Sequence, residues 1–194
     1  MLTPTEIARG TQGALRFLQR DPGAPLYFDS SFAACLRSFR VMVLVAPIYC
    51  LYLLLYYSNV EATADEVEIV GVEALRYIVD WLFFPVIFYE IARRRGWLDR
   101  YPRYISALNW INLPAMILAI VGISISLIAP HAVAVVVELA LRAVFFYWFL
   151  TTTRLTLGIS WLFCGLLLVV NWVPSLFLSL IVERFLGITA IVAG

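Results

Sequence analysis

The sequence contains no lysine, one histidine and three cysteines, and these shortages exclude several kinds of chemistry. Cys35, Cys50 and Cys164 lie in or beside apolar stretches without CxxC or other ligand spacing, which favours packing residues over a metal site. The one histidine, His131, has no neighbouring nucleophile and base, and the chain has no GxSxG motif. We therefore expect a non-enzymatic protein that binds no metal and no cofactor.

Charge is also scarce. Charged residues make up 14% of the 194 residues, 63% are hydrophobic, and the net charge is +1. Soluble domains have about 25% charged and about 45–50% apolar residues. A nearly neutral chain also lacks the concentrated basic face that nucleic acid requires. The composition therefore indicates an integral membrane protein that does not bind nucleic acid.

Apolar runs of membrane length dominate the rest of the chain. About 20 apolar residues in a helix cross the hydrocarbon core of about 30 Å. We predict five spans, at approximately residues 35–57, 74–92, 105–129, 132–150 and 155–182. The predicted fold is an all-α integral membrane protein. It has a five-helix transmembrane bundle in residues 29–194, preceded by a cytoplasmic amphipathic segment in residues 1–28.

The arginines predict the orientation of these spans. Eleven of the 14 arginines lie in the N-terminal segment or in the connections after the second and fourth spans, whereas the acidic connection 59–73 has none. Arginine-rich short connections stay cytoplasmic. We therefore expect a cytoplasmic N-terminus and a periplasmic C-terminus. Arginine without lysine is typical of a GC-rich bacterial genome, which points to a bacterial inner membrane.

The N-terminal segment has the pattern of a short helix. Thr3-Pro4-Thr5-Glu6 is a helix start with a cap, a proline at the first position and a glutamate reaching back. One side of the following residues is apolar and the other carries arginines. This pattern predicts a helix on the cytoplasmic leaflet, with packing on the protein's own loops as the alternative. The residues expected at the lipid surface are Arg9, Arg16, Arg20, Arg93, Arg94 and Arg95.

Four charges lie inside predicted spans and away from their cytoplasmic ends. Each costs roughly 2.5–3.5 kcal/mol to insert, so such charges normally have partners. Arg76 and Asp80 are spaced i,i+4, as are Glu138 and Arg142, so each pair can bridge along one helix face. We hypothesise that the pairs meet across the bundle, with Asn171 in reach. The favoured interpretation is an electrostatic lock between helices; the alternative is an ion or proton path or an anionic-ligand site.

Asparagines also occur beside prolines in the apolar runs. Asn109 and Asn112 precede Pro114, as Asn171 precedes Pro174. Asparagine side chains can bond across helices or to carbonyls that proline leaves unpaired. We predict a helix-packing role for Asn109 and Asn112.

The layout resembles that of bacterial Yip1-like membrane proteins, with a cytoplasmic N-terminal segment, five spans and an outside C-terminus. It is also similar to uncharacterised small inner-membrane proteins of alphaproteobacteria, through Tyr27-Phe28-Asp29-Ser30 and Tyr104-Ile105-Ser106-Ala107-Leu108-Asn109-Trp110. The Yip1-like resemblance implies membrane-organising or partner-binding roles.

Two functions follow from these patterns. The first is a non-enzymatic scaffold or accessory subunit that binds lipid and either other integral membrane proteins or a second copy of itself. The alternative is a small-solute or ion conductor that uses the intramembrane charges.

Overall fold

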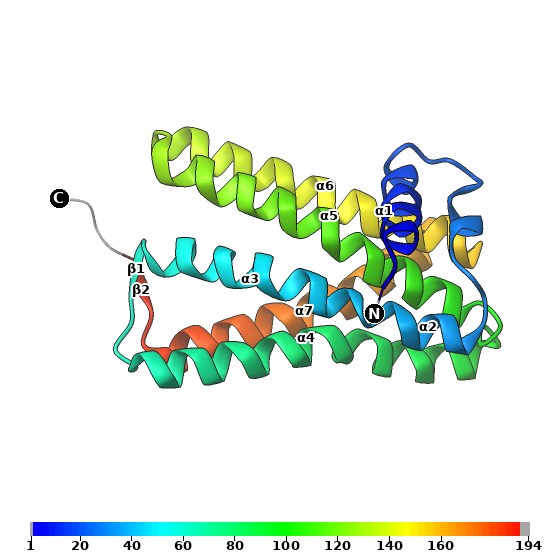
Figure 1. The fold of residues 1–194 in the computed structure, drawn as a ribbon, viewed down its shortest axis with the longest axis horizontal. Coiled ribbons are helices and arrows are strands. Elements are labelled where there is room, and N and C mark those ends of the chain that lie inside the picture. The colour runs from blue at the N-terminus through cyan, green and yellow to red at the C-terminus, as the bar shows by residue number, and fades with distance from the viewer. Residues whose placement is uncertain (1, 191–194) are drawn as a thin grey trace.

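The computed structural model describes residues 2–190, which form a bundle of long helices with one short helix lying across it (Figure 1). The elements in chain order are α1 (Pro4–Leu18), the 3₁₀ helix η1 (Ala24–Tyr27), α2 (Phe32–Ser38), α3 (Val41–Tyr57), β1 (Val60–Glu61), α4 (Glu66–Arg95), α5 (Tyr101–Ile128), α6 (His131–Leu157), α7 (Trp161–Leu186) and β2 (Thr189–Ala190).

Four helices are long and apolar enough to cross a membrane: α2 and α3 taken together, α5, α6 and α7. The all-α class and the apolar character of these four predicted spans are thereby confirmed. The second predicted span is α4, which lies alongside the others in Figure 1 but has three charged residues in its apolar stretch. Its 30 residues measure about 45 Å, at about 1.5 Å per residue.

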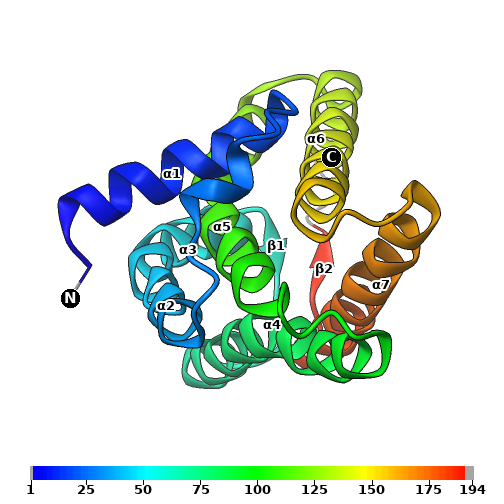
Figure 2. The ribbon, with the colours of Figure 1, turned by 90° about the vertical axis from the view of Figure 1, so that its right-hand side faces the viewer.

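The two ends of the bundle are closed differently. At the arginine-rich end, α4 and α6 each finish at a glycine in the left-handed region, Gly96 (φ 70°) and Gly158 (φ 64°), where other residues are strained. At the opposite end, β1 pairs with β2 in antiparallel register, Val60 with Ala190 and Glu61 with Thr189. This pair joins the α3–α4 connection to the end of α7, and it lies at the far end in Figure 2.

The buried core has an aromatic part and a part beneath α1. Phe84, Phe88, Tyr101, Tyr104 and Phe149 belong to the aromatic part, which joins α4, α5 and α6 near the arginine-rich end. The other part covers the side of α5 and α6 that α1 crosses. α5 contacts both α3 and α6, so it is the central helix of the bundle (Figure 2).

The short helix α1 packs on the protein itself. Thr3 caps it: the Thr3 hydroxyl accepts the Glu6 amide, and the Thr3 amide donates to the Glu6 carboxylate. Its apolar side lies across α5 and α6, where Trp148 Nε1 donates to the Ala14 carbonyl at 2.8 Å and Phe17 is fully buried. This side of α1 therefore packs on the protein, against α5 and α6 and also against the connection after α1, where Phe17 stacks on Phe28. The contact with the connection agrees with the expected alternative of packing on loops, and the contact with α5 and α6 goes beyond it. The reason is that side chains of α5 and α6, which are distant from α1 in the sequence, pack over its apolar side. No local sequence pattern shows this packing.

Candidate functional site

The two predicted charge pairs both form along their own helices. On α4, Arg76 Nε lies 3.8 Å from Asp80 Oδ2. On α6, Arg142 Nη2 lies 2.5 Å from Glu138 Oε1. Within residues 2–190 no ion pair links the α4 charges to the α6 charges, so the expected direct contact between the two pairs is absent.

A cavity of about 860 Å³ separates the pairs. Side chains from α3, α4, α5, α6 and α7 line it. Every residue of the predicted charge cluster and both predicted packing asparagines are among them: Arg76, Asp80, Asn109, Asn112, Glu138, Arg142 and Asn171. The tertiary structure thus brings the predicted cluster to one cavity, on facing walls rather than in contact.

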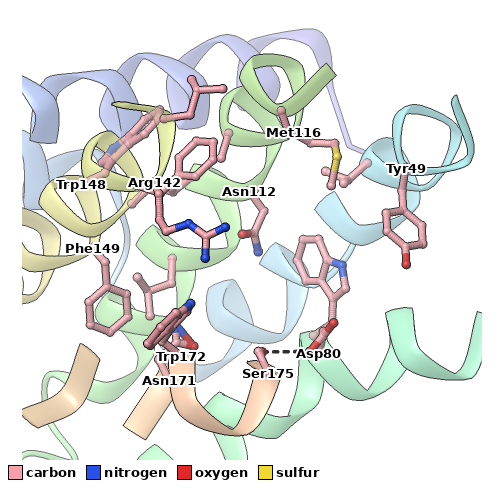
Figure 3. A pocket seen from close by; sticks show the side chains of 18 of the residues that line it. Tyr49, Asp80, Asn112, Met116, Arg142, Trp148, Phe149, Asn171, Trp172 and Ser175 are labelled. Carbon is pink, nitrogen blue, oxygen red and sulfur yellow. Dashed lines mark hydrogen bonds between the residues drawn. The ribbon is translucent and has the colours of Figure 1, made fainter. Parts of the chain in front are cut away.

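The α4 wall is joined to α7 by two serines. Ser175 Oγ donates to Asp80 Oδ1 at 2.9 Å, drawn as the dashed line in Figure 3. Arg76 Nη2 donates to Ser179 Oγ at 3.0 Å. The α4 pair therefore acts as a polar contact between two helices, as the lock interpretation expects of paired intramembrane charges.

Glu73 of α4 lies behind this wall, outside the cavity lining, and the sequence pattern did not single it out. Its side chain is 1% exposed and accepts hydrogen bonds from Tyr49 Oη at 2.7 Å and Tyr57 Oη at 2.9 Å. Arg76 Nη1 lies 3.5 Å from Glu73 Oε1. The sequence pattern placed Glu73 at the end of the acidic connection 59–73, whereas the structure places it inside α4. The i,i+3 spacing to Arg76 was the available signal of a partner.

Tyrosines of α3 form the adjoining wall. Tyr49, Tyr52 and Tyr56 follow a spacing of three and four residues, which places them on one helix face, and all three line the cavity. Their rings stack in sequence, and Tyr49 also stacks on Tyr77 of α4 with 4.7 Å between centroids. The sequence analysis did not single out this stripe, although its helical spacing is readable in the sequence.

The facing wall presents Arg142, which is paired only with Glu138, and two amides that have no protein partner among the described residues. Figure 3 shows Arg142 extending from α6 into the cavity, with Asn112 of α5 and Asn171 of α7 lining the same space. In the described part of the chain the side-chain amides of both asparagines make no hydrogen bond to protein. Trp172 lies beside them and packs edge-on against Phe146, with centroids 5.4 Å apart. These donors and acceptors are available to a ligand.

Aromatic rings close the cavity toward the arginine-rich end. Phe84 packs edge-on against Phe149 and Tyr104, and Phe88 lies against Tyr104 with centroids 4.7 Å apart. The Tyr104 hydroxyl pairs with Thr153 Oγ1 at 2.8 Å. We call Phe84, Phe88, Tyr104 and Phe149 the aromatic floor. Phe84 and Phe149 line the cavity, and Phe88 and Tyr104 pack behind them.

Asn109 lies at the edge of the cavity but contributes to packing. Its amide Nδ2 donates to Ser38 Oγ at 2.9 Å, and both side chains are buried. This bond links α2 to α5, the kind of contact predicted for Asn109. Asn112, one turn further along α5, instead faces the open cavity.

The arginines predicted at the lipid surface all lie at one end of the bundle and keep exposed side chains, Arg16 in part. Several also contact protein. Arg93 and Arg94 pair with Glu90, and the Arg20 guanidinium lies over the Trp161 ring. Other contacts of the same set are Arg9 with the Leu26 carbonyl, Arg16 with Asp21, and Arg95 over the Phe163 ring.

One of these contacts lowers the pKa of a carboxyl group. Arg16 Nη1 donates to Asp21 Oδ2 at 2.6 Å, and the Gly23 amide donates to the other oxygen. Hydrogen bonds to the charged carboxylate favour it, so they hold the pKa of Asp21 below its ordinary value of 3.8.

The lining of the cavity offers charged, amide and aromatic groups to a ligand. Among residues 2–190 no group of three or more His, Cys, Asp or Glu side chains could hold a metal ion. The cavity combines two ion pairs, two unpartnered amides and many aromatic rings. No family model, no curated protein and no solved structure matches this chain significantly. The resemblance to Yip1-like proteins therefore stays a prediction.

Proposed function

We propose that the protein crosses a bacterial inner membrane five times, and that α4 crosses it in addition to the four apolar helices. The support is the length of α4, its position alongside the four apolar helices, and the partnering of its charges by Tyr49, Tyr57 and the α7 serines. Partnered charges lower the cost of placing this helix in the bilayer. The arginine-rich end is then cytoplasmic and the β1–β2 end periplasmic.

The topology can be tested with reporters at the two ends of the chain. Five spans place an N-terminal and a C-terminal reporter on opposite sides of the membrane, whereas four spans place them on the same side. A reporter inserted between α4 and α5 distinguishes the two cases again, because it is cytoplasmic only if α4 crosses. Reporters on the same side would contradict the proposed crossing of α4.

Within this topology we propose that the protein binds and translocates a small solute through the cavity. The single observation that carries this is the cavity itself, which has charged and amide side chains at membrane depth on walls supplied by five helices. Pockets of about 300–1,000 Å³ with a few convergent polar groups are typical ligand sites. Intramembrane ionisable groups that line a cavity typically mark a substrate or ion path.

Reconstitution into liposomes tests this function. Ion and solute flux is compared between the protein, an Arg142→Gln variant and empty liposomes. Arg184→Gln is the matched control, because Arg184 is an exposed arginine outside the cavity. We expect flux that Arg142→Gln reduces and Arg184→Gln does not. Flux equal to that of empty liposomes, together with stoichiometric co-purification of other membrane proteins, would overturn transport in favour of an accessory role.

The accessory role is the second candidate, and two glycines favour it. A methyl group added at Gly71 of α4 or at Gly165 of α7 would meet nothing within 4 Å. Small residues on open helix surfaces allow close approach of another transmembrane helix. Leucine at both positions is expected to abolish co-purification of a partner or of a second copy without unfolding the chain.

Lipid contact is part of either function. We propose that the exposed arginines at the α1 end contact anionic head groups, as clustered arginines beside membrane spans do, with about 1 kcal/mol for each. The test is the thermal stability of the protein in nanodiscs that contain or lack anionic lipid. Equal stability in the two kinds of nanodisc would contradict the proposal.

A further inference from the structure

We propose that the cavity ligand is an amphiphilic anion whose carboxylate or phosphate head binds Arg142 and whose apolar body lies among the surrounding apolar side chains. This rests on the proposed function, since it names the class of ligand for the same cavity. The juxtaposition that carries it is Arg142 beside the unpartnered amides of Asn112 and Asn171 (Figure 3).

The two arginines of the cavity differ in how many protein groups their guanidinium N–H donors contact. Arg76 contacts three oxygen-bearing side chains, those of Glu73, Asp80 and Ser179. A guanidinium has five N–H donors in a planar fork. Within residues 2–190 the Arg142 guanidinium donates a single hydrogen bond, to Glu138. Arg142 therefore has several donors left for a ligand and Arg76 has few.

The partner of Arg142 is also replaceable. The Glu138 side chain is 65% exposed and that of Arg142 is 46% exposed. Exposed ion pairs spaced i,i+4 are weak, so a ligand carboxylate or phosphate can compete with Glu138 for the guanidinium. Arginine is suited to this exchange because its fork matches carboxylate and phosphate oxygens with two parallel hydrogen bonds.

The acids of the opposite wall do not offer an equivalent site for a cation. Asp80 accepts a hydrogen bond from Ser175 and lies beside Arg76. Glu73 is buried beneath two tyrosine hydroxyls and does not line the cavity. Their charges are therefore engaged within the α3–α4–α7 side of the bundle. The unengaged donors belong to Arg142 of α6, Asn112 of α5 and Asn171 of α7. The charged group among them is a cation, which favours an anionic head.

Much of the remaining cavity lining is apolar, and it fits a ligand whose anionic head carries an apolar body. Apolar side chains from α5, α6 and α7 line the same cavity as Arg142, Asn112 and Asn171, including Met116, Leu141, Phe145, Phe146 and Leu168. A purely inorganic anion would leave these side chains without a partner. The volume of about 860 Å³ accommodates a ligand of drug size. An amphiphile satisfies both parts of the lining.

The experiment measures saturable binding of radiolabelled dodecanoate to protein in phosphatidylcholine nanodiscs, corrected with empty nanodiscs. Unlabelled dodecyl phosphate, dodecanol and dodecyltrimethylammonium compete in separate arms, as do acetate and inorganic phosphate. We expect dodecyl phosphate to displace dodecanoate, and the neutral, cationic and head-only competitors to be at least tenfold weaker. Equal competition by dodecanol or by the ammonium would overturn the anionic head while leaving cavity binding intact. Equal competition by acetate or phosphate would overturn the apolar body.

Three variants locate the head group. Arg142→Gln is expected to weaken dodecanoate binding about ten- to hundredfold, the range for loss of a hydrogen bond to a charged group. Glu138→Gln is expected to strengthen it, because the competing carboxylate is removed, and misfolding cannot produce a gain. Arg184→Gln is expected to leave it unchanged. Undiminished binding in Arg142→Gln would overturn the assignment, and the absence of saturable binding by every probe would overturn cavity binding as well.

Discussion

Replacement of Glu73 by glutamine tests the geometry of the α4 wall most directly. The carboxylate is 1% exposed and holds two tyrosine hydroxyls and Arg76. Glutamine keeps the size of the side chain and removes its charge. After the change Arg76 retains Asp80, at 3.8 Å, as its one carboxylate partner, and one of the two tyrosine hydroxyls must reorient toward an amide NH₂ group.

The expected loss follows from burial and from the partners. Removing one member of a buried ion pair costs about 3–5 kcal/mol, and a hydrogen bond to a charged group contributes about 1.5–3 kcal/mol. Glutamine still accepts one hydrogen bond, and Asp80 still faces Arg76. We therefore expect Glu73→Gln to lower the free energy of unfolding by about 2–4 kcal/mol. The matched change Glu138→Gln removes an exposed i,i+4 partner and should cost about 0.5 kcal/mol or less.

Denaturant titration of both variants in a neutral detergent measures the difference, with far-UV circular dichroism to show unchanged helix content. Tyr49→Phe, alone and combined with Glu73→Gln, completes a double-mutant cycle. We expect a coupling of at least about 0.5 kcal/mol, since the two side chains are in contact. Equal losses for Glu73→Gln and Glu138→Gln would refute the buried position of Glu73 and return it to the solvated connection.

The remaining predictions concern α1 and the segment after it. A Cβ at Gly10 would overlap the Trp110 ring, so Gly10→Ala should cost about 1–3 kcal/mol by overpacking and increase protease cleavage of α1. Gly71→Ala, with nothing within 4 Å of the added methyl, should leave both stability and cleavage unchanged. The lowered pKa of Asp21 gives stability that is present above its ordinary value of 3.8 and lost as the pH falls through the lower folded value. Cleavage after α1 should therefore rise at acid pH, and Asp21→Asn, which cannot pair with Arg16, should remove that pH dependence.

Much of the fold was predictable because hydropathy and helix length are local properties. The apolar helices α3, α5, α6 and α7 overlap four predicted runs, and the cap at Thr3 is where its motif placed it. The boundary between the last two runs was wrong, because α6 continues to Leu157 and α7 begins at Trp161. The cover over the apolar side of α1 was not predictable. It depends on Trp110 and Trp148, which are far from α1 in the sequence and become its neighbours only when α5 and α6 pack together.

The candidate site was predictable in part for the same reason. The i,i+4 spacing sufficed to pair Arg76 with Asp80 and Glu138 with Arg142. The distance between the pairs depends on the separation and rotation of α4 and α6, which sequence spacing does not describe. Glu73 was missed because its tyrosine partners come from α3, a different helix.

The sequence by itself therefore determined the helical class, the four apolar helices of membrane length, and the charge pairs within single helices. Each is set by residues that are close along the chain. The tertiary structure alone decided that the paired charges line a common cavity, that Glu73 is buried, and that Arg142 keeps unused donors beside Asn112 and Asn171. These features depend on how side chains of different helices face one another, and that is determined only when the helices pack.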